Sequence, residues 1–200
     1  EPSTAIRYLE KYVKLKPGEV EPYLCLGRCY YQLNDFANSY NSYIQALQIK
    51  PDDAQGLYGL GLNLLRQKNF KEATGILEKA LAQGLNAKEA FFELASAYEE
   101  LQNYGQAAVY YQKYVQSEPE HPWNGWFKLA QTYQKNNDVE KAIEAYRQAL
   151  KLRPEDINSN YNLALLLAAS QQYAEAEQVY KKLIELNPRD SVFYYNHIIQ

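Results

Sequence analysis

The stretch WFKLAQTYQKNNDVEKAIEAYRQALKLRP, residues 126–154, contains the pattern that decides the fold. Its first part places Trp126, Leu129 and Tyr133 at positions i, i+3 and i+7, which lie on one face of a helix. Asp138 follows, and its carboxylate can accept the free backbone N–H groups at the start of a second helix. Apolar residues then return at helical spacing until a proline, which lacks the backbone N–H, ends the pattern. The stretch therefore predicts two helices joined by a short turn.

The same pattern recurs along the chain with a period of 34 residues. The prolines that close the units follow one another at steps of 34, twice 34, 35 and 34 residues: Pro17, Pro51, Pro119, Pro154 and Pro188. A leucine followed by a small residue recurs in phase with them: Leu26-Gly27, Leu60-Gly61, Leu94-Ala95, Leu129-Ala130 and Leu163-Ala164. A fixed period of this length is typical of stacked structural repeats.

Across the units an aromatic or other large residue, the Leu-Gly or Leu-Ala pair, a Tyr or Leu, an Ala and, in all but the second unit, a closing Pro recur on this period, which resembles the tetratricopeptide repeat. The resemblance implies an all-α, right-handed superhelical solenoid of antiparallel helix hairpins, with residues 1–200 forming a single domain. We expect about five repeats, with a partial unit at each end. Their boundaries are 20–53, 54–87, 88–121, 123–156 and 157–190, and the single helices at the ends are 3–16 and 191–200.

The start of each second helix is marked by a short polar side chain, and we expect these side chains to act as helix N-caps. They are Asp35, Asn69, Asn103 and Asp138, with Gln172 as a weaker cap in the last repeat. Three residues depart from the pattern, since Ser39 and Tyr114 replace a small Ala and Asn160 replaces a large apolar residue.

The charge balance argues against nucleic acid as a partner. The chain carries 21 Lys and Arg against 24 Asp and Glu, a formal net charge of −3, so it has no excess of cations to neutralise phosphates. No run approaches the roughly 18 apolar residues that cross a bilayer, and we expect no membrane insertion. Because the chain begins at Glu1 and contains no Met, we expect it to be a piece of a longer protein.

Catalytic and metal-binding patterns are not found in the sequence. Cys25 and Cys29 lie four apart on one predicted helix, which is too far for a disulfide, and the histidines, His121 and His197, are distant in sequence. We therefore expect no enzyme activity, no metal and no cofactor, and reduced thiols in an intracellular, cytoplasmic setting.

Stacked hairpins produce a concave surface lined mainly by the first helix of each repeat, so we expect a protein or peptide ligand there. Asparagine side chains offer both a donor and an acceptor to the backbone of an extended peptide. The alternative for these amides is a solvated helix face. The expected groove residues are Tyr58, Phe92, Asn124, Phe127, Lys128, Asn158, Tyr161, Asn162 and Asn196.

Two other functions remain open at this stage. The first is self-association, because an open stack exposes apolar faces at its ends. The second is recruitment of substrates, as a repeat domain within a longer enzyme. The resemblance further implies a test for the carboxylate clamp that some tetratricopeptide co-chaperones use for chaperone C-termini. In the first possible frame Glu89 and Glu93 stand where the clamp needs basic residues, and the later frames also fail, so we do not expect that role.

Overall fold

The computed structural model describes residues 1–85, 88–117 and 120–199, and these residues form two compact units, Glu1–Gln102 and Asn103–Gln200. The first unit contains α1 (Pro2–Leu15), α2 (Val20–Gln32), α3 (Phe36–Ile49), α4 (Ala54–Arg66), α5 (Phe70–Ala82) and α6 (Lys88–Glu100). The second contains α7 (Tyr104–Gln116), α8 (Pro122–Lys135), α9 (Val139–Leu152), α10 (Ile157–Ala169), α11 (Tyr173–Leu186) and α12 (Ser191–Ile199), with a 3₁₀ turn at Pro188–Asp190 before α12.

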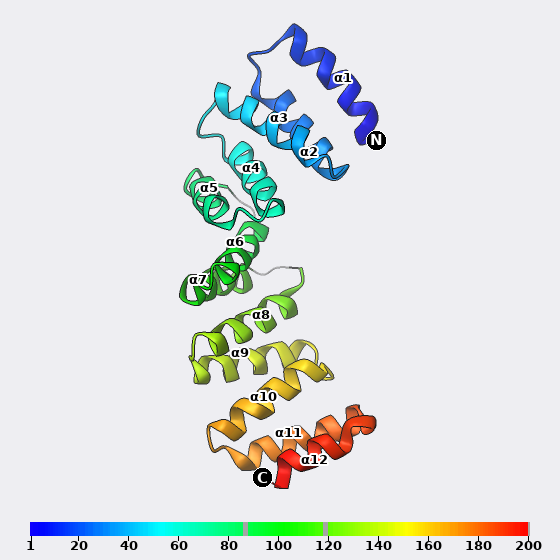
Figure 1. The fold of residues 1–200 in the computed structure, drawn as a ribbon, viewed down its shortest axis with the longest axis vertical. Helices are drawn as coiled ribbons and strands as arrows, with labels where there is room; N and C mark the ends of the chain where they lie inside the picture. The colour runs from blue at the N-terminus through cyan, green and yellow to red at the C-terminus, as the bar shows by residue number, and fades with distance from the viewer. Residues whose placement is uncertain (86–87, 118–119, 200) are drawn as a thin grey trace. The chain divides into compact units, whose positions relative to one another are not determined.

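Within each unit every helix packs against the next one in the chain, as Figure 1 shows. Four of the five predicted hairpins are the pairs α2–α3, α4–α5, α8–α9 and α10–α11. The first helices of neighbouring repeats also meet, because α2 contacts α4 and α4 contacts α6. Over the described residues all regular elements are helical, which confirms the all-α hairpin architecture.

The turn inside each hairpin has the same conformation in all five repeats. One residue of each turn has a positive φ, between 56° and 61°: Asn34, Lys68, Gln102, Asn137 and Gln171. In the first of these turns Asp35 N–H donates to the Tyr30 carbonyl at 2.9 Å, which closes the last turn of α2. This left-handed residue lets the second helix start only a few residues after the first one ends.

The predicted N-caps are confirmed at two positions and wrong at others. Side-chain oxygens of Asp35 and Asn103 accept backbone N–H groups at 3.2 Å, as expected. Asn69 instead donates to the Glu72 carboxylate at 2.6 Å, and an oxygen of Asp138 accepts the Asn136 amide at 2.8 Å. Neither makes a side-chain cap bond, and Gln172 makes none either.

Caps on two first helices were missed by the sequence analysis. Asp53 accepts the backbone N–H groups of Gln55 and Gly56 at 3.1 and 3.0 Å, and Asp156 accepts that of Ser159 at 2.7 Å. Both follow the closing proline by two residues, so the signal was present in the repeat pattern. These caps fix the start of α4 and α10.

The leucine and small-residue pairs are buried at all five repeats, as the sequence predicts. Of the departures, Ser39 on α3 is fully buried, and its hydroxyl donates to the Gly27 carbonyl at 2.9 Å. The Asn63 amide donates to the Ser39 hydroxyl at 3.0 Å and to the Gly59 carbonyl at 2.8 Å, so this polar cluster joins α2, α3 and α4. Asn160 is buried and donates to the carbonyls of Pro154 and Asp156, which secures the turn before α10.

Two glycines hold the ring of Tyr43 between α2 and α4. A Cβ added to Gly27 would lie 2.7 Å from the Tyr43 ring, and one added to Gly59 would collide with the same ring. Tyr43 belongs to α3 and is only 5% exposed. The three helices therefore approach closely only because glycine occupies both facing positions.

We predict that alanine at Gly59 and at Gly75 changes stability in opposite directions. Gly59→Ala forces the Tyr43 ring to move in a packed core and is expected to cost about 1–3 kcal/mol. Gly75 lies on the exposed side of α5 with no atom near an added Cβ, so Gly75→Ala is expected to stabilise by about 0.5–1 kcal/mol. Thermal unfolding of the two variants measures both effects, and a shift of the same sign in both would contradict this account of the core.

Candidate functional site

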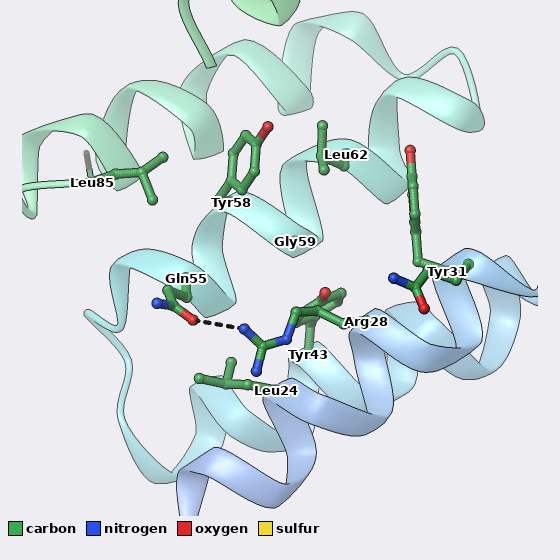
Figure 2. A pocket seen from close by; sticks show the side chains of 10 residues that line it. Leu24, Arg28, Tyr31, Tyr43, Gln55, Tyr58, Gly59, Leu62 and Leu85 are labelled. Atoms are coloured by element: carbon green, nitrogen blue, oxygen red, sulfur yellow. Dashed lines mark hydrogen bonds between the residues drawn. The ribbon is translucent and has the colours of Figure 1, made fainter. Parts of the chain in front are cut away.

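The first unit contains a pocket of about 370 Å³ between α2 and α4. Figure 2 shows the side chains that surround it, with Tyr58 and Leu62 from α4 facing Arg28 and Leu24 from α2. Its full lining consists of Leu24, Arg28, Tyr31, Gln32, Tyr43, Gln55, Tyr58, Gly59, Leu62 and Leu85. Most of these residues belong to first helices, so the pocket lies on the surface that the repeat pattern assigns to the groove.

Tyr43 and Gly59 are part of the wall of this pocket. Because Gly59 has no side chain, the nearly buried Tyr43 ring reaches the pocket from α3. Burial raises the pKa of Tyr43 to about 12, and the Arg28 charge acts in the opposite direction. The Tyr43 hydroxyl has no hydrogen bond to any residue that the structure describes. It is therefore an available donor at the wall of the pocket.

Arg28 lines the pocket with a side chain that is 50% exposed, and three contacts hold its guanidinium, one of which is drawn in Figure 2. Its Nη1 donates to the Gln55 side-chain oxygen at 3.4 Å, and its Nη2 donates to Glu21 Oε1 at 3.1 Å and to the Cys25 sulfur at 3.2 Å. The Glu21 side chain is 69% exposed, so this ion pair contributes only about 0–1 kcal/mol. The guanidinium is thus positioned without being strongly neutralised.

A second, smaller pocket of about 260 Å³ continues from the first and shares Tyr31 and Leu62 with it. Its other lining residues are Leu65, Arg66 and Glu93. Arg66 Nε donates to the Tyr31 hydroxyl at 2.9 Å, and its guanidinium lies 5.7 Å from the centre of the Tyr31 ring. The two pockets form one groove that runs from α2 across α4 to α6.

Glu93 places a half-buried carboxylate at the α6 end of this groove. Burial raises the pKa of Glu93, while the nearby Arg66 charge partly offsets that effect. The pKa of Tyr58 is also raised, first by burial and then by the charges of Glu93 and Glu89. The groove therefore carries the Arg28 cation toward α2, and toward α6 it carries the half-buried Glu93 carboxylate beside the Arg66 cation.

The structure places the predicted aromatic residues of the fourth and fifth repeats in internal contacts. The Phe127 ring stacks on Trp123 with ring centres 5.5 Å apart and meets the buried Tyr146 edge-on at 6.0 Å. The Tyr161 ring lies 5.8 Å from Phe193, on α12. Both rings are half-buried in the packing of the second unit.

The predicted polar residues of the second unit lie on its surface to different degrees. Asn124, Asn158 and Asn196 are exposed, whereas Lys128 and Asn162 are half-buried. Asn124 also lines a separate pocket of about 510 Å³ at the start of α8, together with Trp123 and Arg153.

Of the predicted residues in the first unit, Tyr58 lines the α2–α4 pocket and Phe92 is half-buried on α6. Sequence reasoning missed Arg28, Tyr43 and Gln55 as pocket residues. The available signal was glycine at both Gly27 and Gly59, which leaves room for a ring from the neighbouring helix.

Cys25 and Cys29 are free thiols, as expected. In the parts of the chain that the structure describes, no three His, Cys, Asp or Glu side chains gather in a way that would hold a metal ion. No helix within the described ranges has the length and apolar character needed to span a membrane.

Tandem helical hairpins with a groove along their first helices define a helical repeat protein. The family model for the tetratricopeptide repeat matches residues 58–122 and 127–191, and a second model, TPR repeat, matches residues 27–68. The chain belongs to the tetratricopeptide repeat family.

Among solved structures, the crystal structure of YrrB, described as a TPR protein with an unusual peptide-binding site, matches with a TM-score of 0.81. The two sequences are 20% identical, and the match covers 94% of this chain and 96% of YrrB. At this identity the likeness shows the shared fold, a solenoid of tetratricopeptide hairpins.

Curated relatives are longer proteins. The tetratricopeptide repeat-containing protein trd-1 of Caenorhabditis elegans is 24% identical over 182 residues, which cover 90% of this chain and 23% of trd-1. The protein O-mannosyl-transferase TMTC1 of Homo sapiens is 28% identical over 166 residues, which cover 82% of this chain and 19% of TMTC1. The chain thus spans less than a quarter of the length of each of these two relatives.

We predict that Glu93→Gln stabilises the protein at neutral pH. Because burial raises the pKa of folded Glu93 above its ordinary value of 4.5, the folded state binds a proton more readily than the unfolded state. The free energy of unfolding therefore falls as the pH rises from about 4.5 through the raised pKa. Melting temperatures at pH 4 and pH 7 should show that the gain from Glu93→Gln grows with pH.

The exposed Glu100 on the same helix provides the matched control, since Glu100→Gln should leave this pH dependence in place. A lower melting temperature for Glu93→Gln at pH 7 would mean that attraction to Arg66 outweighs the cost of burial.

Proposed function

We propose that the chain is a non-catalytic scaffold that binds a peptide, or an extended segment of another protein, in the groove along its first helices. The observation that carries this proposal is the pocket between α2 and α4, which combines apolar walls with side-chain donors at fixed positions. Its volume of about 370 Å³ lies within the range of about 300–1,000 Å³ that is usual for ligand sites.

The shape of the groove supports an extended ligand rather than a compact one. The pocket shares Tyr31 and Leu62 with the second pocket, so a bound chain that passes these two side chains would cross α4 toward α6. YrrB, which has a similar fold and is described as a TPR protein with an unusual peptide-binding site, supports a peptide as the class of ligand.

The row of amides in the second unit is proposed as a separate contact surface. Asn124, Asn158 and Asn196 are exposed, and exposed amides can pair with a peptide backbone regardless of its side chains. Asn162 and Lys128 flank this row. Phe127 and Tyr161 belong to the same two helices, and their rings pack on neighbouring aromatic residues.

A role as the recruiting domain of a longer enzyme is the second candidate. It is favoured by the similarity to TMTC1, whose name describes an O-mannosyl-transferase and of which this chain matches only 19%. In that setting the groove would hold a protein substrate while catalysis takes place elsewhere in the longer protein. The same peptide-binding groove serves both candidates.

Self-association is the third candidate, because apolar side chains are exposed on the first and last helices. Leu15 on α1 is 81% exposed and Val192 on α12 is 72% exposed. Light scattering over a range of concentrations separates this function from ligand binding: a constant monomer mass argues against self-association.

We predict that removing the groove walls weakens the binding of a peptide selected on this protein. Peptides are selected from a random library displayed on phage, and the best one is synthesised for titration. Tyr58→Ala with Leu62→Ala removes apolar contact area and is expected to weaken binding at least about tenfold. The second variant, Asn158→Ala with Asn162→Ala, tests the amide row and should leave the melting temperature nearly unchanged.

Lys71→Ala, at an exposed position on α5, is the control and should bind like the wild type. Full affinity in both double variants would place the site outside these surfaces. Tyr161→Ala is unsuitable as a test, because the Tyr161 ring packs on α12 and its loss changes stability.

A further inference from the structure

Three hydrogen-bond donors converge on the pocket between α2 and α4 (Figure 2). The Arg28 guanidinium and the Gln55 amide come from facing helices and are joined by a hydrogen bond of 3.4 Å. The Tyr43 hydroxyl belongs to a side chain that is 95% buried, since the residue is 5% exposed, and it has no partner among the described residues. The Tyr43 hydroxyl is therefore free to donate to an acceptor that enters the pocket.

We infer that this pocket takes the carboxylate of an Asp or Glu side chain from an internal peptide segment, together with a bulky apolar side chain next to it. The inference rests on the proposed function and specifies the ligand of the same groove. Arg28 supplies the charge, and Gln55 and Tyr43 supply neutral donors to the same anionic group.

The charge of the pocket selects an acid over a base. Among the described lining residues Arg28 alone is charged, and its acidic partner Glu21 is largely exposed to water. A ligand carboxylate bound inside the pocket is better shielded from solvent than Glu21, so it forms the stronger pair with the guanidinium. Glu21 acts as a weak internal competitor for this position.

The apolar part of the ligand has its own place beside the donors. Leu24 lies on the α2 side, and Tyr58 and Leu62 line the α4 side. The pocket volume of about 370 Å³ therefore serves both an apolar side chain and the carboxylate.

The second pocket fixes where the acid is placed and favours an internal segment over a chain end. The groove continues past Leu62 toward Glu93, so the bound chain extends beyond the carboxylate site. Burial raises the pKa of Tyr58, and the charges of Glu93 and Glu89 act in the same direction, as expected for two acids near this part of the groove. In the second pocket the Arg66 guanidinium already has the Tyr31 hydroxyl and the Glu93 carboxylate as neighbours, so Arg28 is the cation that faces an acidic ligand side chain.

The test uses heptapeptides with capped ends, each with a central Leu or Phe and with Glu, Gln or Lys at each flanking position. Binding to the full chain is titrated by fluorescence polarisation. Peptides with Glu at the preferred position are expected to bind about tenfold more tightly than their Gln counterparts. The Lys peptides should bind no more tightly than the Gln peptides. Arg28→Gln should remove this preference while leaving the affinity for the Gln peptides unchanged.

Two further variants act on the same site in opposite directions. Tyr43→Phe keeps the ring between Gly27 and Gly59 but removes the hydroxyl, so the Glu peptides should lose about three- to tenfold in affinity. Glu21→Gln removes the internal competitor and should strengthen the binding of the Glu peptides. Arg7→Gln on α1 removes an exposed charge outside the pocket and is the matched control.

The outcomes separate the inference from the proposed function. Equal affinity for Glu and Gln peptides, with binding still lost in the Tyr58→Ala and Leu62→Ala variant, overturns the carboxylate inference and leaves the peptide groove standing. Binding that appears only when the peptide C-terminus is left uncapped overturns the internal-segment assignment.

If no capped or uncapped heptapeptide binds, both the inference and the proposed function fail. A melting temperature near that of the wild type for Arg28→Gln and Tyr43→Phe shows that each loss arises at the site.

Discussion

The close approach of α2, α3 and α4 around the Tyr43 ring is the constraint on which the groove depends. Gly27 and Gly59 face this ring from two helices, and a Cβ at either position would displace it. The ring fills the space between the first helices of two repeats and also reaches the pocket, where its hydroxyl is one of the donors. Packing that stabilises the hairpins thus also builds the floor of the candidate site.

The repeated backbone pattern explains why this chain presents a surface and why its two units present different ones. A left-handed residue in each of the five turns and a buried Leu with a small neighbour in each predicted repeat give the same hairpin pattern within both units. The side chains on the first helices then decide what each surface offers. In the first unit they leave an open pocket, whereas in the second unit Phe127 and Tyr161 are used in packing against Trp123 and Phe193.

Much of the fold follows from the sequence because it depends on local, repeated signals. The proline period, the Leu-small pairs and the turn positions locate the helices, and Asn34 and Asn137 are residues that tolerate a positive φ. Lys68 and Gln102 adopt the same conformation without any such preference, so only the repeat period places them. The caps at Asn69 and Asp138 failed because a neighbouring side chain competes for each of them.

The site was less predictable, because it depends on contacts between helices that are distant in sequence. Tyr58 was found from its phase in the repeat, but Tyr43 belongs to a second helix and reaches the groove only where glycine replaces larger residues. The covering of Tyr161 by α12 follows likewise from tertiary packing rather than from helical phase.

The most direct measurement of the central claim is a map of methyl and amide chemical-shift changes on titration with a capped heptapeptide that contains Glu beside Leu. The account predicts that the changes concentrate on α2 and α4, with the methyl groups of Leu24 and Leu62 among the most affected, and that Tyr43→Phe reduces them at equal peptide concentration. Changes confined to α8, α10 or the terminal helices, with Leu24 and Leu62 unaffected at saturation, would contradict it.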